Sequence, residues 1–337
     1  MTLCIGIDLG GTNLRAGIVA TDTGEVRALQ SVPTLAREGP DAVIERIGGL
    51  ICAVADCGGL ARAPIGAIGA VGIGVPGVVD LDRGEIRFLP NLPGAWPGVP
   101  LSAAIAARVG VPVYLLNDVR AITYGEWKFG AGRTADGSVA TLACFAIGTG
   151  IGGGLVINGR LHLGIGGTAG ELGHQTIDYN GPLCGCGNRG CLEALASGPA
   201  IAALGAKAVM QGINTSIGRL VDYDLNRITP AVIAEAARQG DPLAREIWQQ
   251  AGTYLGVAIA NVLVMLGPRR VVIAGGVAAA GDLLLDPARR TVRERVSMMP
   301  IDQVEIVLAQ LGANAGVVGA ALWAAEQAAA QSGGGSD

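Results

Sequence analysis

The sequence contains little charge, and almost none of its positive charge is lysine. Charged residues make up 15% of the 337 positions, the net charge is −4, and only Lys128 and Lys207 among 24 basic residues are lysines. A protein that binds DNA or RNA neutralises phosphates with a broad basic surface. This composition therefore excludes nucleic acid as a main partner, and it leaves few candidates for a catalytic lysine.

Secretory and membrane-spanning patterns are also lacking. Met1 leads straight into an apolar, strand-like run with no basic segment before it and no cleavage site after it. The most apolar long stretch, Val257 to Val277, is interrupted by Asn261 and by Pro268-Arg269-Arg270. A membrane helix needs about 20 consecutive apolar residues. We therefore expect no membrane partner and a cytoplasmic protein.

Several well-known catalytic motifs are missing. The sequence has no G-x-x-x-x-G-K-[ST], no G-x-S-x-G and no H-E-x-x-H, which excludes P-loop nucleotidases, α/β-hydrolases and helical zinc proteases. Two stretches, 72–77 and 148–153, fit the dinucleotide pattern G-x-G-x-x-G. Both run into strand-like segments, whereas a Rossmann fingerprint must open a helix. Dinucleotide binding is therefore excluded as well.

What the sequence does have is an apolar, glycine-rich pattern that occurs twice. Hydrophobic residues make up 50% of the chain and its 55 glycines are spread along the whole length, as in a compact protein of two domains. Each half opens with strand-like runs and continues with alternating helices and strands. The opening runs are residues 3–9, 14–20 and 26–32, and later 139–147, 154–157 and 159–163. The repeat predicts two α/β lobes facing a ligand-binding cleft.

Capping residues and apolar periodicity mark the helices. Apolar residues at helical spacing predict a helix from Pro40 to about Cys57. Thr229 before Pro230 and Asp241 before Pro242 each place a capping side chain ahead of proline at the first helical position. The second of these helices is expected to run to about Leu266.

Three glycine-rich turns follow predicted strands. Each turn alone is ordinary hairpin chemistry, but glycine also lets backbone N–H groups approach an anion. One loop opens each half and the third follows a late strand, which suits the binding of a triphosphate and a nucleoside. Asp8, beside the first loop, could hold hydrated Mg²⁺. The loops are Gly10-Gly11-Thr12, Gly148-Thr149-Gly150 continuing to Gly154, and Gly275-Gly276.

One histidine and three cysteines lie close together in the sequence. His174, Cys184, Cys186 and Cys191 fall within eighteen residues. In a cytosolic chain with seven cysteines, such clustering indicates metal ligation rather than disulfides. Three thiolates and one imidazole are the ligands of a closed tetrahedral zinc site, which has no position open for water. We therefore predict a structural Zn²⁺.

Carboxylates flank this cluster and also follow an earlier strand. Glu171 and Glu193 could each accept a pair of sugar hydroxyl hydrogen bonds, or they could be surface residues. Asn117 and Asp118 end the predicted strand 113–116 and begin a helix-like segment. Both could cap backbone N–H groups, and Asp118 is equally a candidate general base.

Taken together, these segments resemble the ROK family of sugar kinases and repressors, over nearly the whole chain. The segment Gly170-Glu171-Leu172-Gly173-His174 and the later Cys184-Gly-Cys186-Gly-Asn-Arg-Gly-Cys191-Leu-Glu193 are the most specific part of the resemblance. Matching segments in the same order are residues 8–12, Pro90-Asn91-Leu92-Pro93, Asn117-Asp118, residues 148–154 and Gly275-Gly276.

The resemblance implies a two-lobed fold like those of actin and hexokinase, of the ribonuclease H-like class, with the active site in the cleft between the lobes. It implies that Asp118 is the general base and that Zn²⁺ preorganises the sugar-binding loop. Asp8 and the first two glycine loops would hold Mg²⁺ and the phosphates of ATP, and Gly275-Gly276 would pack against the adenosine. The sugar contacts would be Asn91, Asn117, Asp118, Glu171, His174 and Glu193.

The expected lobes follow from the pattern and the resemblance. The small lobe comprises residues 1–118 and a C-terminal helix of about 315–331. The large lobe is 119–314, with the zinc-binding loop at 174–191, and 332–337 form a flexible tail.

The expected activity is ATP-dependent phosphorylation of glucose to glucose 6-phosphate by a homodimer or higher homo-oligomer. The alternatives are a kinase for N-acetylmannosamine, N-acetylglucosamine or fructose, or a non-catalytic sugar sensor. Repressors of the family resemble this chain only after an added N-terminal DNA-binding domain, for which Asp8 leaves no room.

Overall fold

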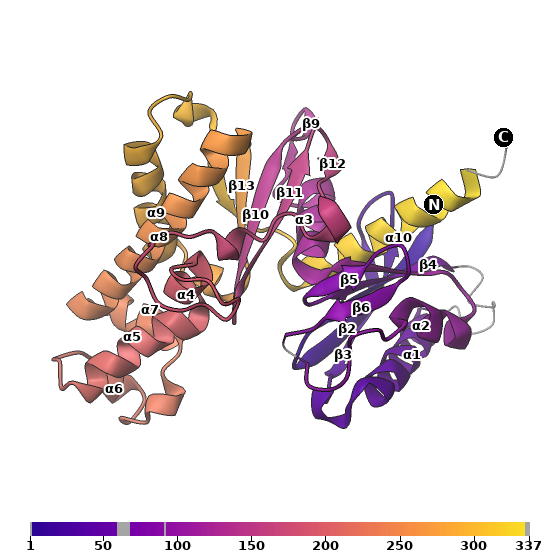
Figure 1. The fold of residues 1–337 in the computed structure, drawn as a ribbon, viewed down its shortest axis with the longest axis horizontal. Helices are drawn as coiled ribbons and strands as arrows, with labels where there is room; N and C mark the ends of the chain where they lie inside the picture. The colour runs from indigo at the N-terminus through magenta and orange to yellow at the C-terminus, as the bar shows by residue number, and fades with distance from the viewer. Residues whose placement is uncertain (1, 59–67, 91, 334–337) are drawn as a thin grey trace. The chain divides into compact units, whose positions relative to one another are not determined.

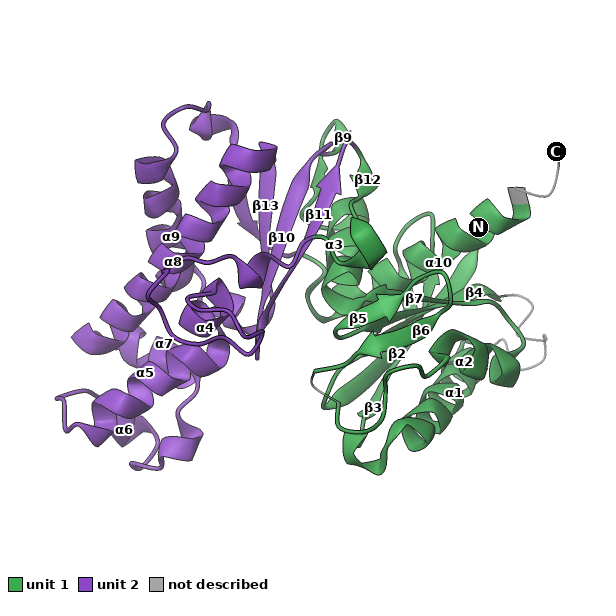
Figure 2. Ribbon diagram, viewed as in Figure 1, with its two compact units in different colours: residues 1–138, 159–169, 310–337 green, residues 139–158, 170–309 purple. Residues whose placement is uncertain are grey.

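The chain folds into two compact units. The computed structural model describes residues 2–58, 68–90 and 92–333. Unit 1 comprises residues 1–138, 159–169 and 310–337, and unit 2 comprises residues 139–158 and 170–309 (Figure 2). The chain therefore passes from one unit to the other after residues 138, 158, 169 and 309.

Unit 1 is built on a five-stranded sheet in the order β3-β2-β1-β4-β7. β1, β2 and β3 form an antiparallel meander, whereas β4 runs parallel to β1 and β7 runs parallel to β4. Parallel strands end at one edge of a sheet, so the residues after β1, β4 and β7 lie along the same edge. The strands are β1 (Leu3–Leu9), β2 (Asn13–Ala20), β3 (Val26–Pro33), β4 (Ile68–Val75) and β7 (Val113–Asn117).

Helices cover both faces of this sheet (Figure 1). Side chains alternate along a strand, and β1 accordingly sends Ile5 into the core beneath α1 and α2, and Cys4 into the core beneath α10. α3 packs along α10 on the latter face. These helices are α1 (Pro40–Cys57), α2 (Leu101–Val109), α3 (Asp118–Phe129) and α10 (Ala315–Gly333). Two small hairpins complete the unit: β5 (Val78–Asp80) with β6 (Glu85–Phe88), and β8 (Arg133–Thr134) with β9 (Gly137–Ser138).

Unit 2 repeats the opening hairpin and then becomes mostly helical. Its sheet has the order β12-β11-β10-β13-β14, with β10 antiparallel to β11 and parallel to β13. The strands of this sheet that belong to unit 2 are β10 (Leu142–Ile147), β11 (Ile151–Ile157), β13 (Arg270–Ala274) and β14 (Glu305–Leu308), whereas the short edge strand β12 (Arg160–Leu161) belongs to residues 159–169 of unit 1. The helices are α4 (Leu192–Ala196), α5 (Gly198–Met210), α6 (Ile217–Leu220), α7 (Pro230–Arg238), α8 (Pro242–Leu266) and α9 (Asp282–Arg295).

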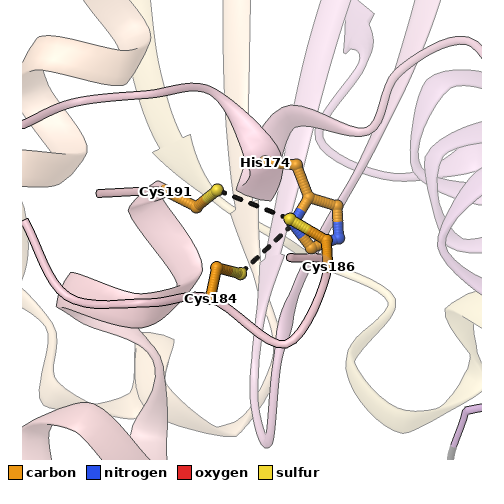
Figure 3. A group of neighbouring side chains, drawn as sticks. All are labelled: His174, Cys184, Cys186 and Cys191. Atoms are coloured by element: carbon orange, nitrogen blue, oxygen red, sulfur yellow. Dashed lines mark hydrogen bonds between the residues drawn. The ribbon is translucent and has the colours of Figure 1, made fainter. Parts of the chain in front are cut away.

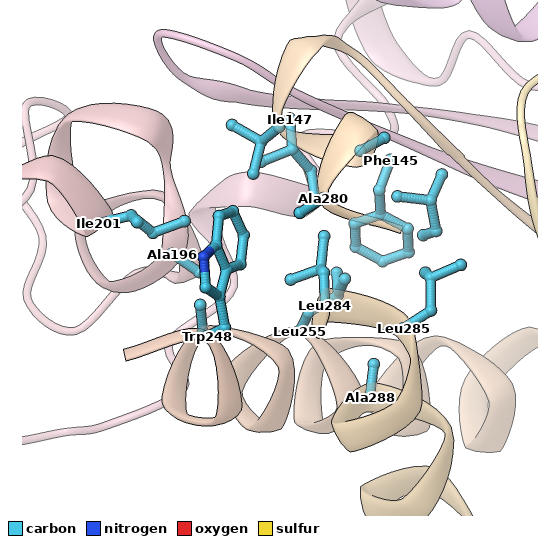
Figure 4. Close-up of a cluster of buried hydrophobic side chains, with 14 of the residues drawn as sticks. Phe145, Ile147, Ala196, Ile201, Trp248, Leu255, Ala280, Leu284, Leu285 and Ala288 are labelled. Carbon is cyan, nitrogen blue, oxygen red and sulfur yellow. The ribbon is translucent and has the colours of Figure 1, made fainter. Parts of the chain in front are cut away.

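The core of unit 2 lies between its sheet and the long helix α8 (Figure 4). Phe145 of β10, Trp248 and Leu255 of α8, and Leu284 of α9 are all at most 1% exposed, and each such side chain contributes about 1.5–3 kcal/mol on burial. By length and composition alone α8 could cross a membrane, but half of its apolar window is buried inside the protein, as in the core helix of a globular domain. Pro268, which interrupts the apolar stretch Val257 to Val277 in the sequence, lies two residues after the end of α8 at Leu266.

The structure confirms the mixed α/β class and several predicted elements. α1 spans Pro40–Cys57 and α8 ends at Leu266, as the apolar periodicity indicates. Both predicted caps form: Thr229 accepts a hydrogen bond from the N–H of Val232 at 3.3 Å, and Asp241 accepts one from Ala244 at 2.9 Å.

Two expected boundaries differ from those in the structure. The expected small lobe ends at residue 118, whereas unit 1 also contains residues 119–138, 159–169 and 310–314, because α3 packs along α10 and against β4. The expected tail begins at Ser332, but α10 continues to Gly333, and the Ser332 hydroxyl donates to the carbonyl of Ala328 at 2.9 Å within the helix. Residues 334–337 lie outside the described part of the chain.

Candidate active site and metal centre

The edge at which β1, β4 and β7 end carries the two acidic residues of unit 1 that are predicted from the sequence to lie in the site. Asp8 near the end of β1 pairs with Gly74 of β4, and Gly74 pairs with Leu116 of β7. Neighbouring strands are about 4.8 Å apart, so Asp8 and Leu116 are separated by roughly 10 Å. Asp118 follows Leu116 by two residues. The two predicted carboxylates of unit 1 therefore lie along one edge, on either side of β4.

Asp118 is the first residue of α3, and Asn117 is the N-cap of this helix. The Asn117 Oδ1 accepts hydrogen bonds from the N–H groups of Val119 and Arg120, each at 3.1 Å, and its Nδ2 donates to the Gly77 carbonyl at 3.0 Å. The half-buried Asp118 accepts a bond from the Val119 N–H at 2.8 Å. The predicted capping role is confirmed for both side chains, and it fixes where the Asp118 carboxylate lies.

The first glycine loop turns sharply beside Asp8. The Gly10 N–H donates to the Asn13 carbonyl at 3.0 Å, and the Thr34 hydroxyl donates to the Gly10 carbonyl at 2.6 Å. Burial raises the pKa of the Asp8 carboxyl, and the charge of Arg15 on the adjacent strand lowers it by less. A carboxylate desolvated in this way is suited to a hard divalent cation, which would restore its missing polar contacts. Gly11 and Thr12 are exposed, and Asn91 lies outside the described residues.

The other two glycine loops lie together at one edge of the unit 2 sheet. β10 and β13 run parallel and pair up to Ala146 and Ala274, so Gly148-Thr149-Gly150 and Gly275-Gly276 follow at the same edge. The Gly148 N–H donates to the Gly150 carbonyl at 2.9 Å. The Gly148 carbonyl in turn accepts from the N–H of Gly198, in the first turn of α5, at 2.9 Å. Backbone donors in such a loop beside a helix N-terminus can bind phosphate oxygens.

The structure brings the four predicted zinc ligands into one cluster (Figure 3). Their candidate ligand atoms all lie within 4.8 Å of one another. The Cys186 and Cys191 sulfurs are 3.7 Å apart, and the Cys184 sulfur is 3.7 Å from His174 Nδ1. Tetrahedral zinc with Zn–S bonds of about 2.3 Å places its sulfur ligands roughly 3.8 Å apart. The donor set and its spacing therefore fit Zn²⁺ with His174 bound through Nδ1.

The loop that carries the cluster, residues 174–191, is called the zinc loop below. Turns and isolated bridges shape it: the Cys184 N–H donates to the Asn188 carbonyl at 2.7 Å, and Thr176 pairs with Cys191. Gly190 has φ +64°, and a Cβ there would lie 1.5 Å from the Asp178 carbonyl oxygen, so only glycine fits. Burial raises the pKa of Cys191 to about 12, and hydrogen bonds with the other two thiols make a smaller contribution in the same direction. Binding of a metal to these sulfurs must therefore displace protons.

The two glutamates expected at the sugar occupy different environments in unit 2. Glu171 is exposed and lies just before the short helical turn Leu172–His174. Glu193 lies in the first turn of α4, and its Oε2 accepts a hydrogen bond from the Ile151 N–H at 2.8 Å, while its Oε1 is 3.8 Å from the Cys184 sulfur. Glu193 therefore links Cys184 of the zinc loop to Ile151 of the second glycine loop.

Sequence reasoning missed two buried charged side chains on α3. Arg120 is 2% exposed and Glu126 is fully buried. On a helix, such residues are usually part of a solvated face, so the sequence alone gives no signal for them beyond the position of Arg120 two residues after Asp118.

Comparison with known proteins gives consistent similarities over almost the whole chain. The profile of the ROK family matches residues 4–327. The glucokinase of Thermotoga maritima is 39% identical over 321 residues, which cover 94% of this chain and 95% of that protein. The xylose repressor of Bacillus subtilis is 34% identical over 258 residues, which cover 77% of this chain and only 61% of the repressor.

A solved structure is similar over the same length. The crystal structure of a ROK family glucokinase from Streptomyces griseus in complex with glucose and AMPPNP superposes with a TM-score of 0.78 and 33% identity, covering 96% of this chain and 99% of that protein.

Proposed function

This chain belongs to the ROK family, and from that premise we propose that it is an ATP-dependent glucokinase. One observation carries the proposal: the chain is similar over nearly its full length to glucokinases, including one solved with glucose and an ATP analogue. The two-lobed sugar kinase fold follows from the same comparison.

In the proposed reaction, Asp118 is the general base. It accepts the proton of the glucose 6-hydroxyl while that oxygen forms its bond to the γ-phosphorus and the bond to the leaving ADP oxygen breaks. The position of Asp118 supports this role, because Asn117 and the Val119 N–H hold it at the start of α3. The charged carboxylate is also favoured by the positive end of the helix dipole.

The other site residues bind and orient the two substrates. Asn117, Glu171, His174, Glu193 and Asn91 are proposed to hold the sugar hydroxyls, and the second glycine loop the phosphates, with Gly275-Gly276 next to the adenosine. Asp8, with the first glycine loop, would hold Mg²⁺, which neutralises phosphate charge when bound. Zn²⁺ would fix the zinc loop without taking part in bond making. Its support is the fit of the four-residue donor set.

The assembly and location are further parts of the proposal. We infer that the protein is a cytoplasmic homodimer and that it has no nucleic-acid or membrane partner. The resemblance supports the dimer, and the net charge of −4 supports the absence of a nucleic-acid partner. Light scattering of the purified protein would measure the oligomeric state.

A panel of substrates tests the proposed activity. Purified protein is assayed for ADP release with ATP and with glucose, fructose, N-acetylmannosamine or N-acetylglucosamine, and with polyphosphate in place of ATP. We expect the highest kcat/KM for glucose with ATP. A higher value for another hexose would overturn the substrate assignment. Glucose binding without turnover would instead indicate a non-catalytic sugar sensor.

A further inference from the structure

α3 carries two buried charges that the site described above does not use. Arg120 is 2% exposed and Glu126 is fully buried. Removing a charge from water costs several kcal/mol unless hydrogen bonds compensate for the loss. Both side chains make such bonds to backbone groups, and the location of these groups in the chain suggests what the charges do.

Arg120 binds the chain at a passage between the units. Its Nε and Nη2 both donate to the carbonyl oxygen of Ala169, at 2.9 and 2.7 Å. Ala169 is the last residue of unit 1 before the chain enters unit 2, and Glu171 is two residues further on. Asp118 is two residues before Arg120. A single guanidinium therefore fixes the backbone within two residues of both a proposed base and a proposed sugar ligand.

Glu126 anchors the other end of α3 in a similar way. Its carboxylate accepts hydrogen bonds from the N–H groups of Ala131 at 2.8 Å, Gln310 at 3.0 Å and Leu311 at 2.7 Å. Gln310 is the first residue of unit 1 after the chain returns from unit 2. α3 is thus bound near both of its ends to segments through which the chain passes between the units.

The packing of α3 leaves it little freedom to shift. A Cβ on Gly319 of α10 would lie 1.7 Å from the Ala121 carbonyl oxygen, and a Cβ on Gly125 would lie 2.6 Å from the Ala315 carbonyl oxygen. The two helix backbones are therefore in direct contact, and close-packed elements of this kind transmit displacements instead of absorbing them. Loss of an anchor at Arg120 would move the segment at Ala169 more readily than α3 itself.

We propose that Arg120 is a positioning residue of the phosphotransfer reaction, which fixes the backbone at Ala169, two residues before Glu171, to the first turn of the helix that carries Asp118. The inference rests on the proposed function, since it uses the roles assigned to those two carboxylates. A misplacement of about 1 Å can reduce a rate by roughly 100-fold. Loss of the Arg120 contact should therefore change kcat and the KM for glucose.

Two substitutions of Arg120 remove its hydrogen bonds to Ala169 to different extents. Arg120→Met removes both donors and keeps the apolar length, and Arg120→Lys restores one donor and the charge. We expect kcat to fall by about 100-fold in the first and about 10-fold in the second. The KM for glucose should rise in both, while the KM for ATP stays within about threefold, because no nucleotide contact is assigned to this segment.

A control separates positioning from a general loss of stability. Arg245 of α8 also donates to a backbone carbonyl, that of Ala237, at 3.0 Å, but within unit 2 and away from the passages. Arg245→Met should lower the melting temperature and leave kcat unchanged. If kcat in the Arg120 variants instead follows the folded fraction, as measured by circular dichroism, or if neither variant folds, Arg120 serves stability alone and the proposal is overturned.

A double substitution tests whether Arg120 acts through the base. Residues that act through one step are non-additive, so Arg120→Lys should lower kcat by less than about threefold in an Asp118→Asn background. An equal loss in both backgrounds would overturn the proposal. The two hypotheses remain distinguishable: turnover retained in Asp118→Asn contradicts the proposed function, whereas loss in Asp118→Asn with full turnover in Arg120→Met contradicts only the positioning role.

Discussion

The start of α3 and the zinc loop hold side chains assigned to the same reaction by different physical means. α3 is a regular helix with a side-chain cap, and Arg120 on it donates two hydrogen bonds to the carbonyl oxygen of Ala169. The zinc loop contains turns and isolated bridges, and its four candidate ligands converge on one point. The first arrangement is held by hydrogen bonds within the chain, whereas the second brings together the four ligands of the proposed Zn²⁺. Loss of metal should therefore affect only one of them.

The largest effect is expected at the base. Asp118→Asn keeps the shape of the side chain and leaves the Asn117 cap in place, so the fold and the affinity for glucose should be retained. Loss of a general base lowers kcat by at least ~100-fold. Steady-state kinetics with matched melting curves measure this. Near-normal turnover in a variant with unchanged melting would refute the role of Asp118.

The next largest effect concerns the metal itself. The cluster predicts one Zn²⁺ per chain, and Cys186→Ala should lose it, with a fall of about 10- to 100-fold in kcat/KM for glucose because the loop is no longer fixed. Elemental analysis of protein purified without chelator measures the zinc content. Cys52→Ala, at an exposed cysteine of α1 in unit 1, is the matched control and should retain full zinc. Full stoichiometry in Cys186→Ala would exclude the assigned ligand set.

Removal of zinc from the unsubstituted protein tests the coupling between metal and sugar. His174 faces the thiols through Nδ1, which leaves Nε2 for a sugar hydroxyl, and Glu171 precedes it by three residues. Zinc and glucose should therefore favour each other's binding by one coupling free energy. A chelator should raise the Kd for glucose about 10-fold and change the Kd for AMPPNP by only a few-fold. If calorimetry finds equal glucose affinity with and without zinc, the loop is held by other contacts.

The sequence predicts the local features of both regions better than their long-range contacts. The ligands of the zinc loop are predictable because three cysteines and a histidine at short spacing are typical of a metal site, and Asn117-Asp118 because capping is a local interaction. The contact of Arg120 with Ala169 joins residues 49 positions apart. Nothing in the periodicity of α3 distinguishes this buried arginine from a solvated one. Nor does the sequence indicate that residues 159–169 belong to unit 1, because their contacts with α3 join positions far apart in the sequence.

A smaller, purely structural effect is expected at the far end of α3. Glu126→Gln removes the charge and replaces one carboxylate oxygen by an amide N–H₂. The Leu311 N–H loses its acceptor if the amide nitrogen takes the place of Oε1, and the Ala131 and Gln310 N–H groups lose theirs if it takes the place of Oε2. Each buried unsatisfied group costs about 1–3 kcal/mol, so the midpoint of urea unfolding should fall while zinc content stays unchanged. Glu235→Gln, on the exposed face of α7, is the control and should change stability by less than about 0.5 kcal/mol. Equal midpoints for the two variants would show that the Glu126 carboxylate is dispensable.

The smallest effect is expected at Asp8, where unit 1 contains a carboxylate that costs stability until a cation binds. Burial raises its folded pKa above the unfolded value, despite the opposing charge of Arg15. A raised carboxyl pKa means that the folded state binds protons more tightly than the unfolded state, so this group's contribution to stability is greatest at low pH and is lost as the pH rises through the folded pKa. Asp8→Asn abolishes that loss. The melting temperature of the variant should exceed that of the unsubstituted protein by a few degrees at neutral pH, and the gap should close as the pH falls towards the ordinary aspartate pKa. Mg·ATP should narrow the gap at neutral pH, because the cation binds only the carboxylate form. A gap that is independent of pH, or a variant that melts lower at pH 7 without nucleotide, would contradict a desolvated Asp8.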